Sequence, residues 1–259
     1  MPSKVILAYS GGLDTSVAIP WLKENYGLDV ITLTADLGGQ DGRSDVKERA
    51  IKSGASKSIV VDGKVDFVNG FVFPALKAGA IYQGQYSLAT ALGRPLIARY
   101  LLDVAHKEGA AAVAHGCTGK GNDQVRFDLS IAGMDPELKI IAPAREWNMS
   151  REQELEYGRS KNITLDFAKK SPYSIDENLW GRSIEAGDLE DPWKEPSEDA
   201  FALTKSVALA PETPTYIEMH FENGVPHSID GNSIDAVTLI QNLNEIAGSH
   251  GIGRVDHLE

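Results

Sequence analysis

The sequence predicts an α/β fold: a doubly wound, mainly parallel sheet followed by a smaller, partial α+β domain. Short apolar runs alternate with amphipathic stretches through the first 142 residues, which is typical of a parallel sheet covered by helices on both faces. Glycine-rich turns directly follow several of these runs. After residue 167 the periodic pattern gives way to a stretch containing several Pro, Gly and Trp residues. We therefore expect a first domain at residues 1–167 and a second at 168–259.

With 42% hydrophobic and 24% charged residues, the 259-residue chain has the composition of an ordinary soluble globular protein. Its net charge of −12 argues against a nucleic-acid-binding protein, which needs a basic face, but leaves room for a local phosphate site. Cys117 is the only cysteine, so no intrachain disulfide is expected. No apolar run reaches membrane-spanning length, and no signal peptide precedes the first strand. We expect a cytoplasmic protein with neither nucleic-acid nor membrane partners.

The predicted elements of the first domain begin with a strand at residues 5–8 and a helix that starts near Asp14. Helical spacing continues over residues 65–78, although Pro74 should kink or end that helix. A capping box of Ser150 and Gln153 opens a helix that runs to about residue 160. The other helices are expected at residues 46–53 and 96–108, the latter closed by Gly109, and the other strands at residues 29–35, 58–62, 110–115, 139–142 and 162–166.

The second domain contains less regular structure. Residues 215–221 and 225–229 flank Asn223-Gly224, the strongest local signal for a β-hairpin. Apolar spacing predicts a helix over residues 233–247, whereas residues 168–198 lack a clear period and are expected to be irregular. One hairpin and one helix are too little to bury a sheet face. We therefore expect only the first part of this domain to be present.

Residues 8–16, Ala-Tyr-Ser-Gly-Gly-Leu-Asp-Thr-Ser, lie where the first strand meets the first helix. Gly11 and Gly12 allow a sharp turn and a close approach of backbone N–H groups to a ligand. The helix N-terminus adds its positive dipole end, and the hydroxyls of Ser10, Thr15 and Ser16 add donors. The combination predicts a pyrophosphate site, although it is neither a Walker A loop nor a dinucleotide-binding fingerprint. The alternative is an ordinary tight turn with Asp14 or Thr15 as the helix N-cap.

Residues 115–127, His-Gly-Cys-Thr-Gly-Lys-Gly-Asn-Asp-Gln-Val-Arg-Phe, form a second polar stretch after a predicted strand. Its hydroxyl, amide, carboxylate and guanidinium groups offer both donors and acceptors, as a zwitterionic amino acid requires. The alternative is an exposed loop in which Asp123 caps the next helix. Because ligands bind at the carboxyl ends of parallel strands, we expect the loops after Ala8, Ala35 and His115 to meet at one crevice. Nothing near Cys117 in the sequence activates its thiol, and no His and Cys residues show metal-ligand spacing, so no metal site is expected.

The first stretch resembles the pyrophosphate loop of the ATP-pyrophosphatase superfamily. Together with the second, it resembles the two hallmark stretches of the argininosuccinate synthase family, ligases that join citrulline and aspartate. Further matches lie at residues 93–98, 172–179 and 253–256, so the resemblance covers essentially the whole chain. It implies an adenine nucleotide hydrolase-like ATP-binding domain, followed by the N-terminal part of a synthetase domain. Members of the family run further, to a terminal helix used in forming a homotetramer.

The resemblance implies an arginine-biosynthetic carbon–nitrogen ligase. The citrulline ureido oxygen attacks the α-phosphorus of ATP, carried with Mg²⁺, and the aspartate amine then displaces AMP. The implied ATP contacts are Ala8, Tyr9, Ser10, Gly11, Gly12, Leu13, Asp14, Thr15, Ser16, Ala35 and Gly116. The implied aspartate contacts are Thr118, Asn122 and Asp123. The implied citrulline contacts are Tyr86, Thr90, Asn122, Arg126, Ser174, Ser183 and Glu259. Of all these residues, Ser10, Asp14 and Arg126 are expected to be catalytic.

One position departs from the family pattern. A citrulline-contacting hydroxyl residue is expected at position 91, where this chain has Ala91, and Thr90 is the nearest substitute. Two other functions stay open. One is another adenylating enzyme of the superfamily, although a tRNA-thiolating enzyme would need more cysteines and a basic surface. The other is a nucleotide-binding module without turnover.

Overall fold

The computed structural model describes residues 3–39, 45–163 and 172–257. The chain divides into two compact units. Unit 1 comprises residues 1–36, 41–63 and 93–167, and unit 2 comprises residues 37–40, 64–92 and 168–259. The two expected domains are continuous in sequence, whereas unit 2 takes in residues 64–92 from the first half of the chain.

Unit 1 contains a five-stranded sheet in the order β3-β2-β1-β4-β5, in which every neighbouring pair is parallel. Its three central strands carry fully buried apolar side chains, including Val5, Ile6 and Leu7, as expected of strands covered on both faces. The predicted α/β fold with a parallel sheet is confirmed. The strands are β1 (Lys4–Ala8), β2 (Asp29–Asp36), β3 (Lys57–Asp62), β4 (Ala112–Ala114) and β5 (Lys139–Ile141).

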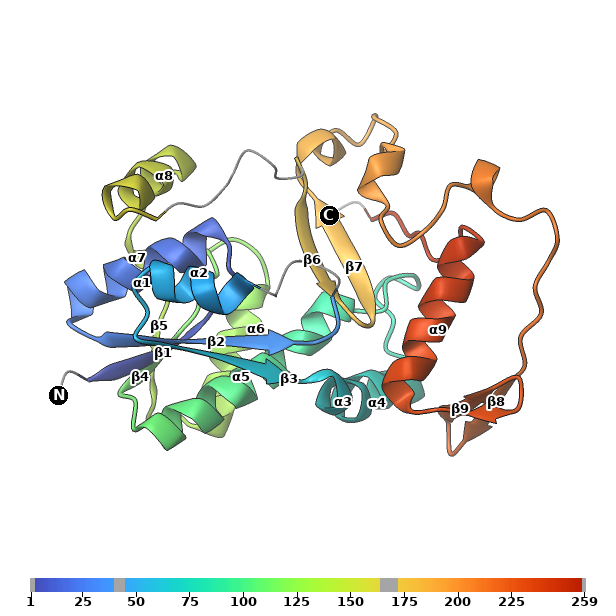
Figure 1. Ribbon diagram of the computed structural model, residues 1–259, viewed down its shortest axis with the longest axis horizontal. Coiled ribbons are helices and arrows are strands. Elements are labelled where there is room, and N and C mark those ends of the chain that lie inside the picture. The colour runs from blue at the N-terminus through green and yellow to red at the C-terminus, as the bar shows by residue number, and fades with distance from the viewer. Residues whose placement is uncertain (1–2, 40–44, 164–171, 258–259) are drawn as a thin grey trace. The chain divides into compact units, whose positions relative to one another are not determined.

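The helices of unit 1 cover both faces of this sheet, with α1 and α2 above it in Figure 1 and α5 below it. This arrangement follows from the strand order. The chain passes from β1 outward to β2 and β3, and then returns to β4 on the opposite side of β1. Because each crossover between parallel strands is right-handed, the two directions of winding place their helices on opposite faces of the sheet. The capping box predicted at Ser150 is present at the start of α8. The helices are α1 (Leu13–Tyr26), α2 (Val46–Lys52), α5 (Ala89–Glu108), α6 (Asp123–Met134), α7 (Pro143–Glu146) and α8 (Arg151–Ser160).

The strand order places the loops that follow β1 and β4 next to each other. β1 pairs with β2 on one side and with β4 on the other, so the direction of winding reverses at β1. In open α/β sheets, ligands bind at this switch point, beyond the carboxyl ends of the strands. Residues 9–12 and 115–122 therefore occupy the position where a ligand site is expected.

Two predicted helices differ from the structure. The helix expected from residue 96 begins at Ala89, because Pro95 lies inside α5 near its start instead of ahead of it. The stretch around Pro74 is helical throughout, but it changes character from α3 (Lys64–Phe67) through the π-helical η2 (Val68–Val72) to α4 (Phe73–Lys77). Pro74 is tolerated because it lies in the first turn of α4.

The expectation of an irregular segment at residues 168–198 is wrong for its central part. β6 (Ser174–Asn178) and β7 (Gly181–Glu185) form an antiparallel pair. Their side chains are mostly polar, so no apolar alternation revealed them in the sequence. Short 3₁₀ turns follow at η4 (Gly187–Glu190), η5 (Glu198–Ala200) and η6 (Val207–Leu209).

The Asn223-Gly224 hairpin is confirmed, with strands β8 (Met219–Glu222) and β9 (Val225–Ile229). β8 is shorter than the predicted strand, and β10 (Asn232–Ser233) adds a third strand to this sheet. The last predicted helix is α9 (Ala236–Ser249), capped by Asp235. Most of the strand expected at residues 162–166 lies outside the described residues. None of the helices in the described part of the chain combines the length and apolar character needed to cross a membrane.

Candidate nucleotide and amino-acid sites

The glycine turn of residues 9–12 is an extension of β1. Tyr9 N donates to Leu33 O at 2.8 Å and Tyr9 O accepts from the Thr34 hydroxyl at 2.7 Å, so the turn starts from a fixed backbone. Gly11 has a φ of +80°, a conformation that favours glycine. Gly12 is the N-cap of α1. The alternative in which Asp14 or Thr15 caps this helix is wrong, because both lie inside its first turn.

The start of α1 has the features of an anion site. No side chain caps its first turn, so the backbone N–H groups there are not taken by a capping oxygen. Ser10 Oγ accepts from Gly12 N at 3.3 Å and lies 3.2 Å from Thr15 Oγ1, and the hydroxyls of Tyr9 and Ser16 are 2.9 Å apart. Burial raises the pKa of Tyr9, which keeps its hydroxyl protonated. The loop thus gathers neutral donors around the positive end of a helix.

Asp14 points at α8 and not at the loop hydroxyls. Arg151 Nη1 lies 2.8 Å from Asp14 Oδ1 and 3.9 Å from Glu154 Oε2. Glu154 is buried, and burial together with the charge of Asp14 and a hydrogen bond to it raises the pKa of Glu154 to about 7. Arg151 only partly offsets this effect. One arginine therefore lies beside two carboxyl groups, and the raised pKa of Glu154 leaves that group partly protonated near neutral pH.

The loop after β4 packs against the first turn of α1. A Cβ on Gly116 would lie 2.9 Å from Thr15 Cγ2, so only glycine fits there without a shift. The preceding residue, His115, is fully buried and stacks on Phe127 with ring centroids 5.3 Å apart. Its Nε2 lies 2.8 Å from Asp128 Oδ1, and its Nδ1 accepts from Cys117 N at 3.3 Å.

These bonds assign the proton of a neutral His115 to Nε2, because Nδ1 acts as an acceptor. Burial lowers the pKa of His115 in spite of the nearby Asp128. Burial also raises the pKa of Cys117 to about 11, so its thiol is not activated, as the sequence predicts. His115 and Cys117 therefore serve to shape this loop.

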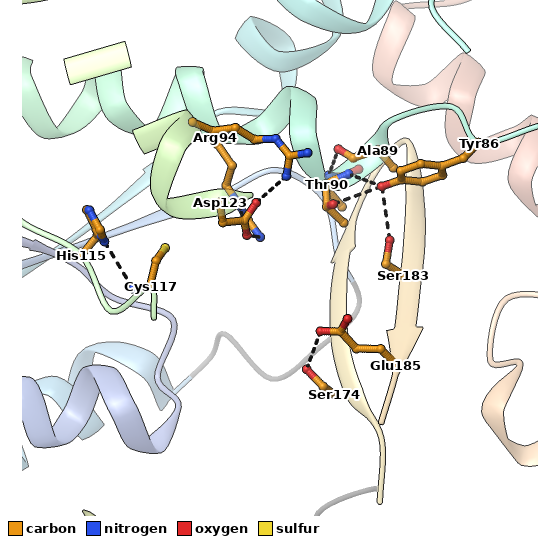
Figure 2. Close-up of polar contacts among 12 residues, drawn as sticks. Tyr86, Ala89, Thr90, Arg94, His115, Cys117, Asp123, Ser174, Ser183 and Glu185 are labelled. Carbon is orange, nitrogen blue, oxygen red and sulfur yellow. Dashed lines mark hydrogen bonds and ion pairs between the residues drawn. The ribbon is translucent and has the colours of Figure 1, made fainter. Parts of the chain in front are cut away.

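Two arginines hold the carboxylate of Asp123, and Figure 2 shows the contact with one of them, Arg94. Arg94 Nε donates to Asp123 Oδ2 at 2.8 Å, and Arg126 Nη1 donates to Oδ1 at 2.7 Å. Burial opposes ionisation, but the two guanidinium groups outweigh it and keep the pKa of Asp123 below its usual range. The alternative in which Asp123 caps α6 is wrong, since Asn122 occupies the cap position and Asp123 is the first helical residue.

The other residues of the implied aspartate site lie on the same loop. Thr118 is exposed, and its hydroxyl donates to Lys120 O at 3.1 Å. Asn122 is exposed just ahead of Asp123. The turn is closed by Gln124, whose Nε2 donates to Gly119 O at 2.7 Å. Unit 1 thus brings together the residues implied for ATP and those implied for aspartate.

In unit 2, the hydroxyl of Tyr86 collects three polar contacts from residues implied for citrulline (Figure 2). It accepts from Thr90 N at 3.1 Å and lies 3.1 Å from Thr90 Oγ1 and 3.3 Å from Ser183 Oγ. The hydroxyl of Thr90 thus lies beside that of Tyr86, although position 91 is alanine. Asn178 and Trp180 fix the neighbouring backbone by donating to Ala89 O at 2.6 Å and to Ser87 O at 3.1 Å.

Register places Ser174 and Ser183 on one face of the β6–β7 pair. Ser174 is opposite Glu185 and Asp176 is opposite Ser183, and residues two apart on a strand point the same way. The Ser174 hydroxyl also donates to Glu185 Oε1 at 3.4 Å. Asn122 and Arg126, also implied for citrulline, belong to unit 1. Glu259, the last implied contact, lies outside the described residues.

Three arginines that contact implied site residues were not singled out from the sequence. Arg94 lies in the Gly-Arg-Pro element at residues 93–95, so that match offered a signal for it. Arg49 and Arg151 lie on α2 and α8 without any local motif, and only the fold reveals that they contact Gly11 and Asp14. Across the described ranges, no group of three or more His, Cys, Asp or Glu side chains is arranged to hold a metal ion.

Comparison with known proteins identifies the family. A family model described as the arginosuccinate synthase N-terminal HUP domain matches residues 4–164, and one for the C-terminal domain matches residues 173–259. Argininosuccinate synthases of Dehalococcoides mccartyi strain 195 and Synechococcus elongatus are 54% and 56% identical, over 100% and 99% of this chain. The chain spans 64% of the length of each of these relatives.

Among solved structures, a crystal structure described as a predicted subunit of tRNA methyltransferase from Methanocaldococcus jannaschii superposes with a TM-score of 0.42 at 15% identity. The match covers 61% of this chain and 76% of the chain in that crystal structure. A likeness this distant indicates nothing about function. The two family models, in contrast, together cover almost every residue, and the chain belongs to the argininosuccinate synthase family.

Proposed function

We propose that the chain belongs to an enzyme that ligates citrulline and aspartate to argininosuccinate at the expense of ATP. The citrulline ureido oxygen attacks the α-phosphorus of MgATP, the bond from that phosphorus to the bridging oxygen of the β-phosphate breaks, and pyrophosphate leaves. The aspartate amine then attacks the activated carbon, the bond from that carbon to the ureido oxygen breaks, and AMP leaves. Both steps need charge stabilisation and alignment more than a dedicated nucleophile.

ATP is proposed to bind at residues 8–16, with Ala35 and Gly116 beside it. The supporting observation, which carries the proposal, is the uncapped N-terminus of α1 following the Gly11-Gly12 turn at the switch point of the sheet. Backbone N–H groups and the hydroxyl of Ser10 would stabilise the leaving pyrophosphate. Asp14, which is ion-paired with Arg151, would exchange that partner for the metal–nucleotide complex.

Aspartate is proposed to bind at Thr118, Asn122 and Asp123. An ionised Asp123 suits the ammonium group of an amino acid, and the two arginines hold it in that state. Citrulline is proposed to contact Tyr86, Thr90, Ser174 and Ser183 of unit 2, together with Asn122, Arg126 and Glu259. The hydroxyls clustered on Tyr86 suit an uncharged ureido group, which both donates and accepts hydrogen bonds.

We also propose that the enzyme works in the cytoplasm as a homo-oligomer, a tetramer in its full-length form. The cytoplasm is supported by the lone cysteine, Cys117, which has no disulfide partner in the chain. The oligomeric state is supported by family membership alone.

Calorimetric titration with MgATP, aspartate and citrulline, each added separately, tests these assignments. We expect MgATP to bind to the wild-type chain and to bind less tightly to Ser10→Ala. Aspartate affinity should fall on Asp123→Asn and citrulline affinity on Tyr86→Phe, each with MgATP affinity unchanged. Failure of the wild-type chain to bind MgATP would overturn the proposal.

A nucleotide-binding chain without turnover is the second candidate, because the chain spans only 64% of its relatives' length. It predicts MgATP binding with no response to citrulline. Restoring the remaining length found in those relatives should then produce activity. A different adenylating enzyme would instead release pyrophosphate with another co-substrate and not with citrulline.

A further inference from the structure

The pyrophosphate loop contains no positive side chain of its own. Residues 8–16 include neither Lys nor Arg, whereas a Walker A loop carries a lysine that reaches the phosphates. A triphosphate and its pyrophosphate leaving group carry several negative charges, which cationic groups commonly stabilise. Any cationic side chain at this turn must therefore come from another helix, strand or loop.

Arg49 of α2 lies directly against the glycine turn. Its Nη1 donates to Gly11 O at 3.0 Å, and a Cβ on Gly11 would lie 3.2 Å from Cζ and from Nη2 of Arg49. The guanidinium therefore packs on the Cα of Gly11, in space that a larger residue would fill. Val46 and Ala50, which are 1% and 0% exposed, anchor α2 in the core and so fix where Arg49 points.

The hydrogen bond from Arg49 sets the orientation of the Gly11–Gly12 peptide. In a planar trans peptide, the C=O and N–H groups point in opposite directions. Because the carbonyl faces Arg49, the N–H of Gly12 faces the other way, and it lies 3.3 Å from the hydroxyl of Ser10. If this peptide flipped, a carbonyl oxygen would face the position proposed for the anion and would repel it.

Arg49 pairs with a carboxylate that is more exposed than the guanidinium itself. Asp45, one turn earlier, accepts from its Nη2 at 2.9 Å, but Asp45 is more exposed than Arg49, at 55% against 32% of the side chain. Its positive charge still reaches the loop, where it favours ionisation of Tyr9 and so opposes the effect of burial on the pKa of that group. Arg49 thus combines a fixed hydrogen bond to the turn with a positive potential at it.

We propose that Arg49 is a positioning residue of the nucleotide site, which holds the Gly11–Gly12 peptide with its N–H toward the pyrophosphate and adds positive charge there. The inference rests on the proposed function, since it assigns a further residue to the same ATP site. Arg49 acts on the β- and γ-phosphates through the turn, so its loss should affect ligands that contain pyrophosphate more than AMP.

Calorimetry with MgATP, pyrophosphate and AMP on the full 259-residue chain tests this inference. Arg49→Ala should bind MgATP and pyrophosphate about 10- to 100-fold more weakly, the loss expected for one hydrogen bond to a charged group. AMP affinity should change by less than about threefold. Arg49→Lys, which keeps the charge, should recover most of the affinity for MgATP. Lys52→Ala is the matched control, because Lys52 is exposed on the same helix and pairs with Glu48.

A second variant keeps Arg49 and should strengthen MgATP binding instead of weakening it. Asp45→Asn removes one negative charge beside Arg49, so MgATP should bind about two- to fivefold more tightly, in line with the strength of an exposed ion pair. The inference is overturned if Arg49→Ala binds MgATP like the wild type, or loses MgATP and AMP equally. It is also overturned if Asp45→Asn does not bind MgATP more tightly than the wild type. This second variant tests the inference even if Arg49→Ala does not fold. A wild-type chain that binds neither MgATP nor pyrophosphate would overturn the proposed function as well.

Discussion

Arg94 and Asp123 form the ion pair that fixes the predicted aspartate-binding carboxylate, with Nε and Nη2 of the arginine 2.8 and 2.7 Å from Oδ2. Arg94→Ala should lower aspartate affinity by about tenfold, since hydrogen bonds to charged groups contribute about 1.5–3 kcal/mol. Without Arg94, the carboxylate is free to turn toward Arg126 and leave its position. Calorimetry with aspartate measures the effect.

The matched control for this change is Lys107→Ala, on the exposed side of the same helix. It should leave aspartate affinity unchanged, and both variants should keep the MgATP affinity of the wild type. A folded Arg94→Ala chain that binds aspartate normally would show that this ion pair has no part in aspartate recognition.

Gly116 and Gly119 offer a matched pair of substitutions within one loop. Gly116→Ala brings a methyl group to 2.9 Å from Thr15 Cγ2, whereas Gly119→Ala meets no atom within 4 Å. Thr15 is buried and β-branched, so it cannot easily move aside. MgATP titrations should show at least tenfold weaker binding for Gly116→Ala and wild-type binding for Gly119→Ala. Equal affinities would mean that this contact does not shape the nucleotide site.

Glu154 should make the chain less stable as pH rises from about 4.5 to about 7. Its pKa is about 7 in the folded protein against 4.5 for an unperturbed glutamate, so the unfolded chain loses this proton first on raising the pH. The folded state therefore binds more protons across this window, and the free energy of unfolding falls by about 1–3 kcal/mol. The charged groups that act on Glu154 are Asp14, which raises its pKa, and Arg151, which lowers it, and the side chain of Trp147 also lowers it through a hydrogen bond.

Urea unfolding of Glu154→Gln at pH 5 and pH 8 measures this contribution. The variant should be stabilised relative to the wild type at pH 8 and much less so at pH 5, because glutamine cannot ionise. Glu156→Gln, at an exposed position of the same helix, should show no such difference. The same pH dependence in wild type and Glu154→Gln would rule out this role of Glu154.

His115 should be a stability determinant of the second loop. His115→Ala removes a fully buried ring and the partner of Asp128, and should lower the free energy of unfolding by about 2–4 kcal/mol. His115→Gln retains a donor toward Asp128 and should cost less. Burial lowers the pKa of His115 in the folded protein, so folding favours the neutral ring. The contribution of His115 to the free energy of unfolding is therefore present above pH 6.5 and is lost as pH falls below that value. Denaturation curves that are alike for wild type and His115→Ala would contradict this role.

The sheet and both loops could be predicted from the sequence, because buried strands such as Val5–Leu7 and their glycine turns leave strong local signals. The β6–β7 pair could not, since its polar residues Ser174, Asp176 and Glu177 carry no apolar alternation. The start of α5 was missed because Gly93 and Pro95 usually mark the end of regular structure.

The partners of the site residues were beyond the reach of sequence patterns. Arg151 is 137 residues from Asp14 and Arg49 is 38 residues from Gly11, so only the fold brings each pair together. The face shared by Ser174 and Ser183 follows from strand register, which requires knowing that the strands pair.

Exchange of labelled pyrophosphate into ATP tests the central claim most directly, because it reports formation of a citrulline adenylate before aspartate reacts. The chain is incubated with MgATP, labelled pyrophosphate and citrulline, with and without aspartate. We predict label in ATP that requires citrulline, does not require aspartate, and is lost in Ser10→Ala. Exchange that proceeds equally well without citrulline, or no exchange even when all three substrates saturate the chain, would contradict the account.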